Sequence, residues 1–238
     1  MSGATAPSPS APWSVERHRG PAAAHHGLDV PEPTHRAVWA FSLAGPALVL
    51  GSTQRIDDVD VEAAAALGVE VVRRRSGGGA VLLEPDDVAW IDVIVPRGDP
   101  LWHDDVAVAA EWLGSVWVAA LTDLGVAGGV VHRGGLACGA LGSVVCFGGT
   151  GPGEVLVRGE KIVGISQRRT RAGARFQCSV PLRWRPDRHA ALLAPGVRRL
   201  HPSAGVDEVR RLLDAVAVHP LTGVPADAVL DALVARLP

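Results

Sequence analysis

The stretch RRRSGGGAVLLE, residues 73–84, joins two apolar strand patterns through three consecutive glycines. Glycine loses more conformational freedom on folding than any other residue, so a glycine triplet between strands indicates that bare backbone is required there. Backbone N–H groups of such a loop can approach an anion closely, and neighbouring arginines can bind carboxylate or phosphate. The stretch matches neither a P-loop nor a dinucleotide-binding fingerprint. It therefore predicts an anion-binding loop, or else a glycine-rich turn flanked by solvated arginines.

The periodicity of apolar residues around this loop predicts an α+β fold. The expected strands are 37–50 (interrupted at Gly45-Pro46), 69–75, 80–84, 88–96, 154–157, 161–167 and 176–182. The expected helices are 59–68, 104–124, 206–217 and 225–236. We expect the three strands between residues 69 and 96 to form an antiparallel meander. Because strands and helices do not alternate regularly, the fold class is a mixed, largely antiparallel sheet with flanking helices.

Length and charge narrow the class of protein. The chain has 238 residues, enough for one domain with a substantial core. Residues 1–15, rich in proline and small residues, are expected to be a disordered tail, and residues 16–238 a single domain. A formal net charge of -2 disfavours a general nucleic-acid or membrane-surface binder, and no signal peptide or membrane span is predicted. Cys138, Cys146 and Cys178 have neither metal-ligand spacing nor an even number, so we expect a cytoplasmic protein and no metal site.

Lys161 is the only lysine among 23 basic residues. A lysine kept where every other basic residue is arginine indicates a need for a compact ammonium rather than for charge alone. Lys161 opens a strand directly after a tight turn, and Gly164 and Ser166 leave space along that strand. On a two-residue period, Lys161 shares a face with Val163 and Ile165, which predicts a partly apolar pocket. The alternative is a lysine at the solvent-exposed edge of a hairpin.

Together, these two motifs resemble the catalytic domain of the lipoate–protein ligase and octanoyl transferase family, which is related to biotin–protein ligases. Residues 73–81 match the family pattern RRxSGGGAV, and residues 159–167 match its lysine motif. VLGSTQ at 49–54, with Trp39 upstream, is similar to the opening motif of the family. The resemblance covers about residues 35–185. It implies a biotin/lipoate ligase-type catalytic domain that transfers an acyl group to a protein lysine.

For the ligases, the resemblance implies that lipoate and ATP, with Mg²⁺, form lipoyl-adenylate before transfer to the acceptor. The acceptors would be lipoyl domains of 2-oxoacid dehydrogenase subunits or the glycine-cleavage H protein. Lys161 would stabilise charge on the reacting oxygens as a preorganised cation. The implied substrate-binding residues are Arg74, Ser76, Gly77, Gly78, Gly79, Ala80, Gly164 and Ser166. Because both motifs match, the sequence favours a lipoate–protein ligase.

Some positions depart from the ligase pattern. Leu83 stands where the ligases have a histidine, and Gly153-Glu154 replace an Asn-Asp pair on the ATP and magnesium side. The accessory C-terminal domain of the longer ligases is not expected either. These departures leave open a non-catalytic acyl-binding module that retains only the pocket.

The VVCFGG motif around Cys146 supports a second enzyme. Some octanoyl transferases of this superfamily resemble it, with a Cys-Phe pair shortly before the lysine hairpin, and their cysteine accepts the acyl group from octanoyl-acyl carrier protein without ATP or another cofactor. Cys146 would then be the nucleophile, and Lys161 would favour its thiolate. The alternative role of Cys146 is that of a small buried apolar residue. Cys178 is expected in a strand core, Cys138 in a loop or the core, and His132 in a structural or surface position.

Overall fold

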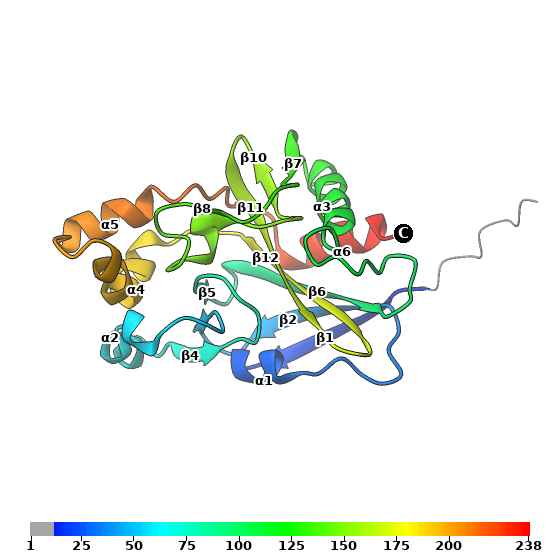
Figure 1. Ribbon diagram of the computed structural model, residues 1–238, viewed down its shortest axis with the longest axis horizontal. Helices are drawn as coiled ribbons and strands as arrows, with labels where there is room; N and C mark the ends of the chain where they lie inside the picture. The colour runs from blue at the N-terminus through cyan, green and yellow to red at the C-terminus, as the bar shows by residue number, and fades with distance from the viewer. Residues whose placement is uncertain (1–11) are drawn as a thin grey trace, which may run out of the picture.

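The computed structural model describes residues 12–238 (Figure 1). Strand β1 (Ser14–Gly20) and helix α1 (Ala22–Gly27) come first, so regular structure begins inside the segment expected to be a tail. The rest of that expected tail, residues 1–11, lies outside the described residues.

A seven-stranded sheet forms the centre of the molecule, in the order β1-β2-β6-β12-β11-β10-β7 (Figure 1). After β1, its strands are β2 (Ala37–Leu43), β6 (Val88–Pro96), β7 (Gly129–Val131), β10 (Val155–Val157), β11 (Glu160–Arg169) and β12 (Gly173–Pro181). Strands β1 and β2 are parallel, and all the other neighbours in this sheet are antiparallel. The predicted mixed, largely antiparallel sheet is confirmed.

A second sheet has three strands in the order β4-β3-β5, formed by β3 (Ala47–Leu50), β4 (Glu70–Arg73) and β5 (Val81–Leu83). The antiparallel meander predicted for residues 69–96 is wrong. Both β4 and β5 pair with β3, β4 in parallel, and β6 belongs to the large sheet. Helix α2 (Val61–Ala66) carries the chain back between β3 and β4, as a parallel pair requires. The glycine loop therefore crosses the end of β3 to join its two neighbours.

Helices flank the sheets on two sides. Besides α1 and α2, they are α3 (Glu111–Asp123), α4 (Pro186–Leu200), α5 (Val206–Asp214) and α6 (Ala226–Arg236). Helices α3 and α6 cover one face of the large sheet, whereas α2, α4 and α5 gather at the opposite end of the molecule (Figure 1). Helix α3 begins at Glu111 rather than at residue 104, because turns precede it. Helix α4 was not expected from the sequence. Short elements complete the chain: the 3-10 turns Ile56–Asp58 and Cys146–Gly148, and strands β8 (Ala137–Cys138) and β9 (Gly149–Thr150).

Three buried apolar clusters connect these layers. One lies between the large sheet and helices α3 and α6, and a second surrounds α2, α4, α5 and the small sheet. The third fills the space between the two sheets and reaches α1. Burial of apolar surface is the main force that stabilises such a fold. Among residues 12–238, no helix is both long and apolar enough to cross a membrane.

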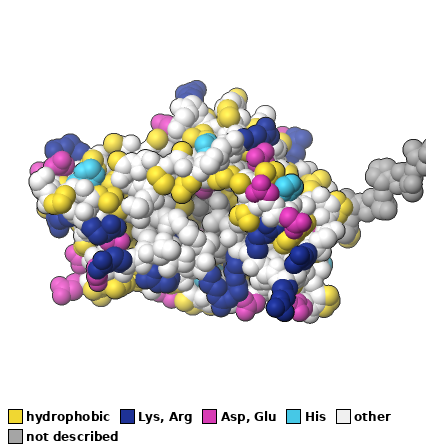
Figure 2. All heavy atoms as spheres, viewed as in Figure 1, with side chains coloured by type: hydrophobic (Ala, Val, Ile, Leu, Met, Phe, Trp, Pro, Cys, Tyr) yellow, Lys and Arg dark blue, Asp and Glu magenta, His cyan; other side chains and the backbone are white. Residues whose placement is uncertain are grey.

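Charged side chains of both signs are interspersed over the face drawn in Figure 2. Several arginines are paired with carboxylates, as in Arg188 with Glu84 at 2.5 Å and Arg199 with Asp58 at 2.6 Å. This mixed surface agrees with the net charge of -2.

Candidate functional site

The glycine loop packs directly against the segment that carries Cys146. A Cβ atom added to Gly79 would lie 2.5 Å from the carbonyl carbon of Val145 and 2.7 Å from the nitrogen of Cys146. The N–H of Ala80 donates to the Val144 carbonyl, and the N–H of Cys146 donates to the Ala80 carbonyl, each at 2.9 Å. Bare backbone is therefore needed at Gly79 so that the loop and the Cys146 segment can pair.

The other two glycines of the loop are constrained differently. Gly78 has a φ of +97°, which L side chains rarely adopt, and a Cβ there would come within 3.0 Å of Nη2 of Arg74. Gly77 has a negative or extended φ and no atom within 4 Å of its Cβ position. Within residues 12–238, the N–H groups of Gly77, Gly78 and Gly79 donate no hydrogen bond to the protein. Their predicted role in binding an anion is compatible with this geometry and stays a prediction.

The contrast between Gly79 and Gly77 gives a first prediction. Gly79→Ala is expected to lower the free energy of unfolding by about 1–3 kcal/mol, because the added methyl group meets backbone atoms that cannot rotate away. Gly77→Ala is the matched control and is expected to change it by less than about 0.5 kcal/mol. Urea denaturation of both variants measures the difference. Equal stabilities of the two variants would contradict the packing role of Gly79.

Arg74 organises the loop from the inside. It is buried, and its Nη2 donates to the carbonyls of Gly77 at 2.7 Å and Gly79 at 2.9 Å, while its Nη1 donates to the carbonyl of Val49 at 3.2 Å. Its Nε–H is buried and has no partner among the described residues. A buried donor without a partner costs free energy, so this N–H is available to a ligand oxygen.

Lys161 lies at the start of β11 and is 2% exposed. Its Nζ is 2.7 Å from Oε2 of Glu154 and 3.0 Å from the carbonyl oxygens of both Cys146 and Gly149. These three acceptors match the three N–H donors of an ammonium. The Sγ of Cys146 lies 4.0 Å from the same nitrogen, and the ring centroid of Phe147 lies 5.0 Å from it. Lys161 is therefore a fixed cation beside the Cys146 thiol.

Glu154 holds this lysine in place. From the sequence, Glu154 was identified only as a departure from the ligase pattern. It is 4% exposed; its Oε2 accepts from the N–H of Gly151 at 2.7 Å and its Oε1 from that of Ile165 at 3.0 Å. Burial by itself would lower the pKa of Lys161, but the Cys146 sulfur and the Glu154 carboxylate beside it raise that pKa above its ordinary value. One feature of the sequence could have identified Glu154: it is the single carboxylate residue between Cys146 and the hairpin turn.

A bulge in β11 explains the surroundings of Lys161. The pairing of β10 with β11 shifts register at Ile162, which is left as an extra residue. The expected alternation of Lys161 with Val163 and Ile165 is therefore broken. Val163 lies in the apolar cluster beneath α3, and Ile165 belongs to that cluster and also lines the pocket described below. Lys161 points to the opposite face, where its Cε is 3.4 Å from the Cβ position of Gly164. The missing side chain at Gly164 leaves the room that the lysine occupies.

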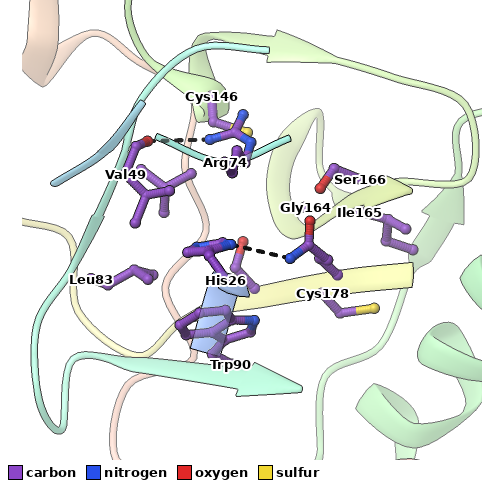
Figure 3. A pocket seen from close by; sticks show the side chains of 13 residues that line it. His26, Val49, Arg74, Leu83, Trp90, Cys146, Gly164, Ile165, Ser166 and Cys178 are labelled. Carbon is purple, nitrogen blue, oxygen red and sulfur yellow. Dashed lines mark hydrogen bonds between the residues drawn. The ribbon is translucent and has the colours of Figure 1, made fainter. Parts of the chain in front are cut away.

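A pocket extends from Cys146 between the glycine loop, β11 and β12 (Figure 3). Its apolar lining consists of Val49, Val81, Leu83, Trp90, Ile165 and Cys178. Its polar lining includes Arg74, Ser166, Gln177 and His26. Arg74 lies next to Cys146 in the view of Figure 3, and His26 lies farther from Cys146, beside Trp90. This lining suits a chain that is apolar along most of its length and has its reactive end at Cys146.

Most of the predicted site residues meet at this pocket. Arg74, Cys146, Gly164 and Ser166 line it. Ser76 borders it, since its Oγ lies 3.1 Å from Oγ of Ser166. Gly77, Gly78, Gly79 and Ala80 form the loop beside it, and Lys161 contacts Cys146 as described.

Of the other residues singled out in the sequence, Cys178 is buried in β12, as expected, and also lines the pocket. Cys138 is exposed in β8. His132 is half-buried, in keeping with the expected structural or surface position, and its Nε2 lies 2.9 Å from the Gly135 carbonyl oxygen. Trp39 lies outside the pocket lining, with the guanidinium of Arg175 5.2 Å from its ring centroid.

The surroundings of Lys161 bear on whether a nucleotide or a metal ion can bind at this site. All three N–H groups of Lys161 already have acceptors, one of them the Glu154 carboxylate. A nucleotide phosphate could bind Lys161 only by displacing one of them, and the negative charge of Glu154 would repel it. The residues around Lys161 therefore do not fit a phosphate in this arrangement. Residues 12–238 contain no group of three or more His, Cys, Asp or Glu side chains placed to hold a metal ion.

Comparison with known proteins identifies the family. Residues 31–237 match the model of the lipoyl protein ligase A/B catalytic domain. The chain is 32% identical over 212 residues to octanoyltransferase LipM of Kyrpidia tusciae. This match covers 86% of this chain and 73% of that protein.

Two solved structures have a similar fold. One is a bipartite lipoate protein ligase of Thermoplasma acidophilum, described together with its E2 lipoyl domain. The two structures match with a TM-score of 0.67 and 15% sequence identity, and the match covers 94% of this chain and 82% of that chain. The other is lipoate-protein ligase A bound with ATP, with a TM-score of 0.58, 14% identity, and coverage of 94% and 93%. At such identities the likeness shows the fold, and it confirms the expected ligase-type architecture. The family-model match and the LipM relative show more than the fold: this chain belongs to the lipoyl protein ligase A/B catalytic domain family, whose members are enzymes.

Proposed function

We propose that the protein transfers an acyl group from a thioester donor to a lysine of a lipoyl-domain protein, with Cys146 carrying the group as a thioester. The observation that carries this proposal is the position of Cys146 at the pocket, with its Sγ 4.0 Å from the Lys161 ammonium. A neighbouring cation favours the thiolate, which is the nucleophilic form of cysteine. The activity is that of an octanoyltransferase, as the LipM relative is named, rather than that of the ligase favoured by the motifs.

The first step loads the enzyme. The Cys146 thiolate attacks the carbonyl carbon of an octanoyl thioester on acyl carrier protein. A new C–S bond forms, the bond to the carrier sulfur breaks, and the carrier thiolate leaves and takes up a proton. The acyl chain lies along the apolar lining of the pocket. The ammonium of Lys161 stabilises the thiolate before attack and the negative oxygen that develops during it.

The second step delivers the acyl group. The neutral ε-amine of an acceptor lysine attacks the carbonyl carbon of acyl-Cys146. The amide bond forms, the C–S bond breaks, the Cys146 thiolate is restored, and the proton of the amine passes to solvent. Lys161 acts electrostatically in both steps and not as a base, because the Glu154 carboxylate holds it in its charged form. The acceptor is a lipoyl domain of a 2-oxoacid dehydrogenase subunit or the glycine-cleavage H protein.

This route needs no nucleotide, because a thioester is already activated for acyl transfer. The proposal is supported by the surroundings of Lys161, where Glu154 occupies the position at which a phosphate would have to bind. The ATP-dependent ligation of free lipoate is the competing function, and the following experiment separates the two.

Mixing the protein with octanoyl-acyl carrier protein is expected to give an octanoyl adduct on Cys146 without ATP. Intact-protein mass spectrometry and peptide mapping measure it. Adding an apo lipoyl domain should discharge the adduct onto the acceptor lysine. Cys146→Ala should lose both the adduct and the transfer, because no nucleophile remains. Cys138→Ala, which removes an exposed cysteine, is the matched control and should retain both. Modification of the acceptor by free lipoate, with strict dependence on ATP and Mg²⁺ and full activity in Cys146→Ala, would refute the proposal.

A further inference from the structure

One wall of the pocket comes from a segment that the family model does not match. The match begins at residue 31, whereas His26 belongs to α1. The imidazole of His26 lies among the pocket side chains, between Arg74 and Trp90 in Figure 3. Its ring centroid is 4.6 Å from that of Trp90, with 31° between the ring planes. This position makes His26 a candidate for contact with the acyl chain.

Two arginines of the large sheet hold this segment against the pocket. Arg175 donates from Nη1 to the Leu28 carbonyl at 2.7 Å and from Nη2 to the His25 carbonyl at 2.9 Å. Arg168 pairs with Asp29 at 2.6 Å. These contacts fix the backbone on both sides of His26. The His26 imidazole is therefore held at the pocket by the packing of α1 against the large sheet.

The hydrogen bonds of His26 fix its tautomer. Burial, followed by the charges of Arg175 and Arg74, lowers the pKa of His26 to about 3, so the ring is neutral at physiological pH. Oε1 of Gln177 accepts from Oγ of Ser76 at 3.2 Å, and the Gln177 amide nitrogen lies 3.3 Å from Nδ1 of His26. The amide therefore donates to Nδ1, and the single proton of the neutral ring is on Nε2. That Nε2 is buried and has no hydrogen-bond partner among the described residues.

A plain octanoyl chain has no atom that can accept this N–H. With such a chain in the pocket, the buried Nε2–H of His26 stays without a partner, so this donor contributes nothing to binding. A chain that carries an acceptor atom at the right position would give this N–H a partner. The same reasoning applies to the unpaired Nε–H of Arg74, which lies nearer Cys146 and is placed for the acyl carbonyl instead.

We propose that His26 selects the acyl group by donating a hydrogen bond from Nε2 to an acceptor atom on the hydrocarbon chain, so that the enzyme prefers such a chain over plain octanoyl. The proposal rests on the acyl-binding role of the pocket given under the proposed function. It adds a residue that determines specificity and the chemical class of acyl chain that this residue recognises.

Competition between two donors tests the inference. Wild-type protein is mixed with equal amounts of octanoyl- and oxo-octanoyl-acyl carrier protein, with the oxo group at successive chain positions in separate reactions. The ratio of the two adducts on Cys146 is read by mass spectrometry at early times. At one position or more, the oxo chain is expected to exceed octanoyl on the order of tenfold, the size of one buried hydrogen bond. A lipoyl donor forms a further arm and compares sulfur with oxygen as the acceptor.

His26→Phe keeps an aromatic ring against Trp90 and removes the donor, so the adduct ratio should fall to about one. Calorimetry with free octanoate and free oxo-octanoate repeats the comparison without any thioester chemistry. Equal adduct ratios and equal affinities in the wild-type protein would overturn the inference and leave the proposed function standing. An oxo preference that persists in His26→Phe would overturn it as well. An oxo preference in calorimetry that depends on His26, with no adduct on Cys146, would support the inference and overturn the proposed function. If His26→Phe fails to fold, the wild-type ratios alone decide.

Discussion

Replacing Lys161 with arginine is expected to reduce acyl transfer by about a thousandfold while the protein still folds. The three acceptors around Nζ surround a compact ammonium, and Gly164 leaves space for only a slender side chain beside it. A guanidinium is planar and spreads its charge over three nitrogens, so it cannot reproduce this geometry beside the Cys146 sulfur. It still offers a positive charge to Glu154, so the buried carboxylate keeps a partner.

Single-turnover transfer from octanoyl-acyl carrier protein to an apo lipoyl domain measures the loss, and circular dichroism establishes that the variant is folded. Lys161→Met is the matched comparison. It leaves the buried carboxylate of Glu154 without a counter-ion and should also lower the free energy of unfolding by about 3–5 kcal/mol. Transfer by Lys161→Arg at close to the wild-type rate would remove the lysine from the mechanism.

Arg175→Met is expected to lower the free energy of unfolding by about 3–5 kcal/mol. Arg175 is 1% exposed, and its Nε lies 2.5 Å from Oδ2 of Asp92, which is fully buried. Burial raises the pKa of Asp92, so its carboxylate depends on the opposing pull of the arginine and of the Trp90 indole N–H at 2.8 Å. Without Arg175, this carboxylate is a buried charge with no counter-ion. Urea denaturation of the variant measures the effect.

The double variant Arg175→Met with Asp92→Asn separates the two tasks of Arg175. It removes the uncompensated charge and should recover most of the lost stability. In both the single and the double variant, the carbonyls of His25 and Leu28 lack their donor, so both should lose the preference for an acceptor-bearing acyl chain. A double variant as unstable as Arg175→Met would show that the buried charge is not what costs the stability.

The sequence predicted the parts of the site that are local along the chain. The hairpin that presents Lys161 was found because a tight turn and two short apolar runs are adjacent in sequence. The loop at Gly77–Gly79 was found because glycine triplets are rare for a physical reason. Its packing against the Cys146 segment was not predicted, since that contact joins positions more than sixty residues apart. Glu154 was missed as a partner of Lys161 for a related reason: the bulge at Ile162 turns the lysine to the other face, and alternation of residue types carries no sign of it.

Pairing partners and packing account for the errors in the fold. Apolar alternation identified β4, β5 and β6 as strands, but nothing in it determines which neighbour each strand takes. Helix α4 was missed because Pro195 and Gly196 stand inside it and normally indicate a helix end. Burial of Leu192, Leu193 and Val197 in the cluster around the small sheet outweighs that local cost.

The attachment of α1 to Arg175 also bears on the order in which the molecule can be assembled. The two hydrogen bonds join residues that are separated in the sequence by 147 and 150 positions. Forming them therefore brings together the ends of a very long stretch of chain. Contacts of such separation form late in folding, after the local hairpins. A chain that has emerged from the ribosome only as far as Lys161 already contains the glycine loop, the cysteine and the lysine, but it lacks Arg175, which binds the carbonyls of His25 and Leu28. Until β12 follows, β6 lacks its neighbour on one side, and the unfinished protein exposes an unpaired strand edge beside its pocket that chaperones would have to shield.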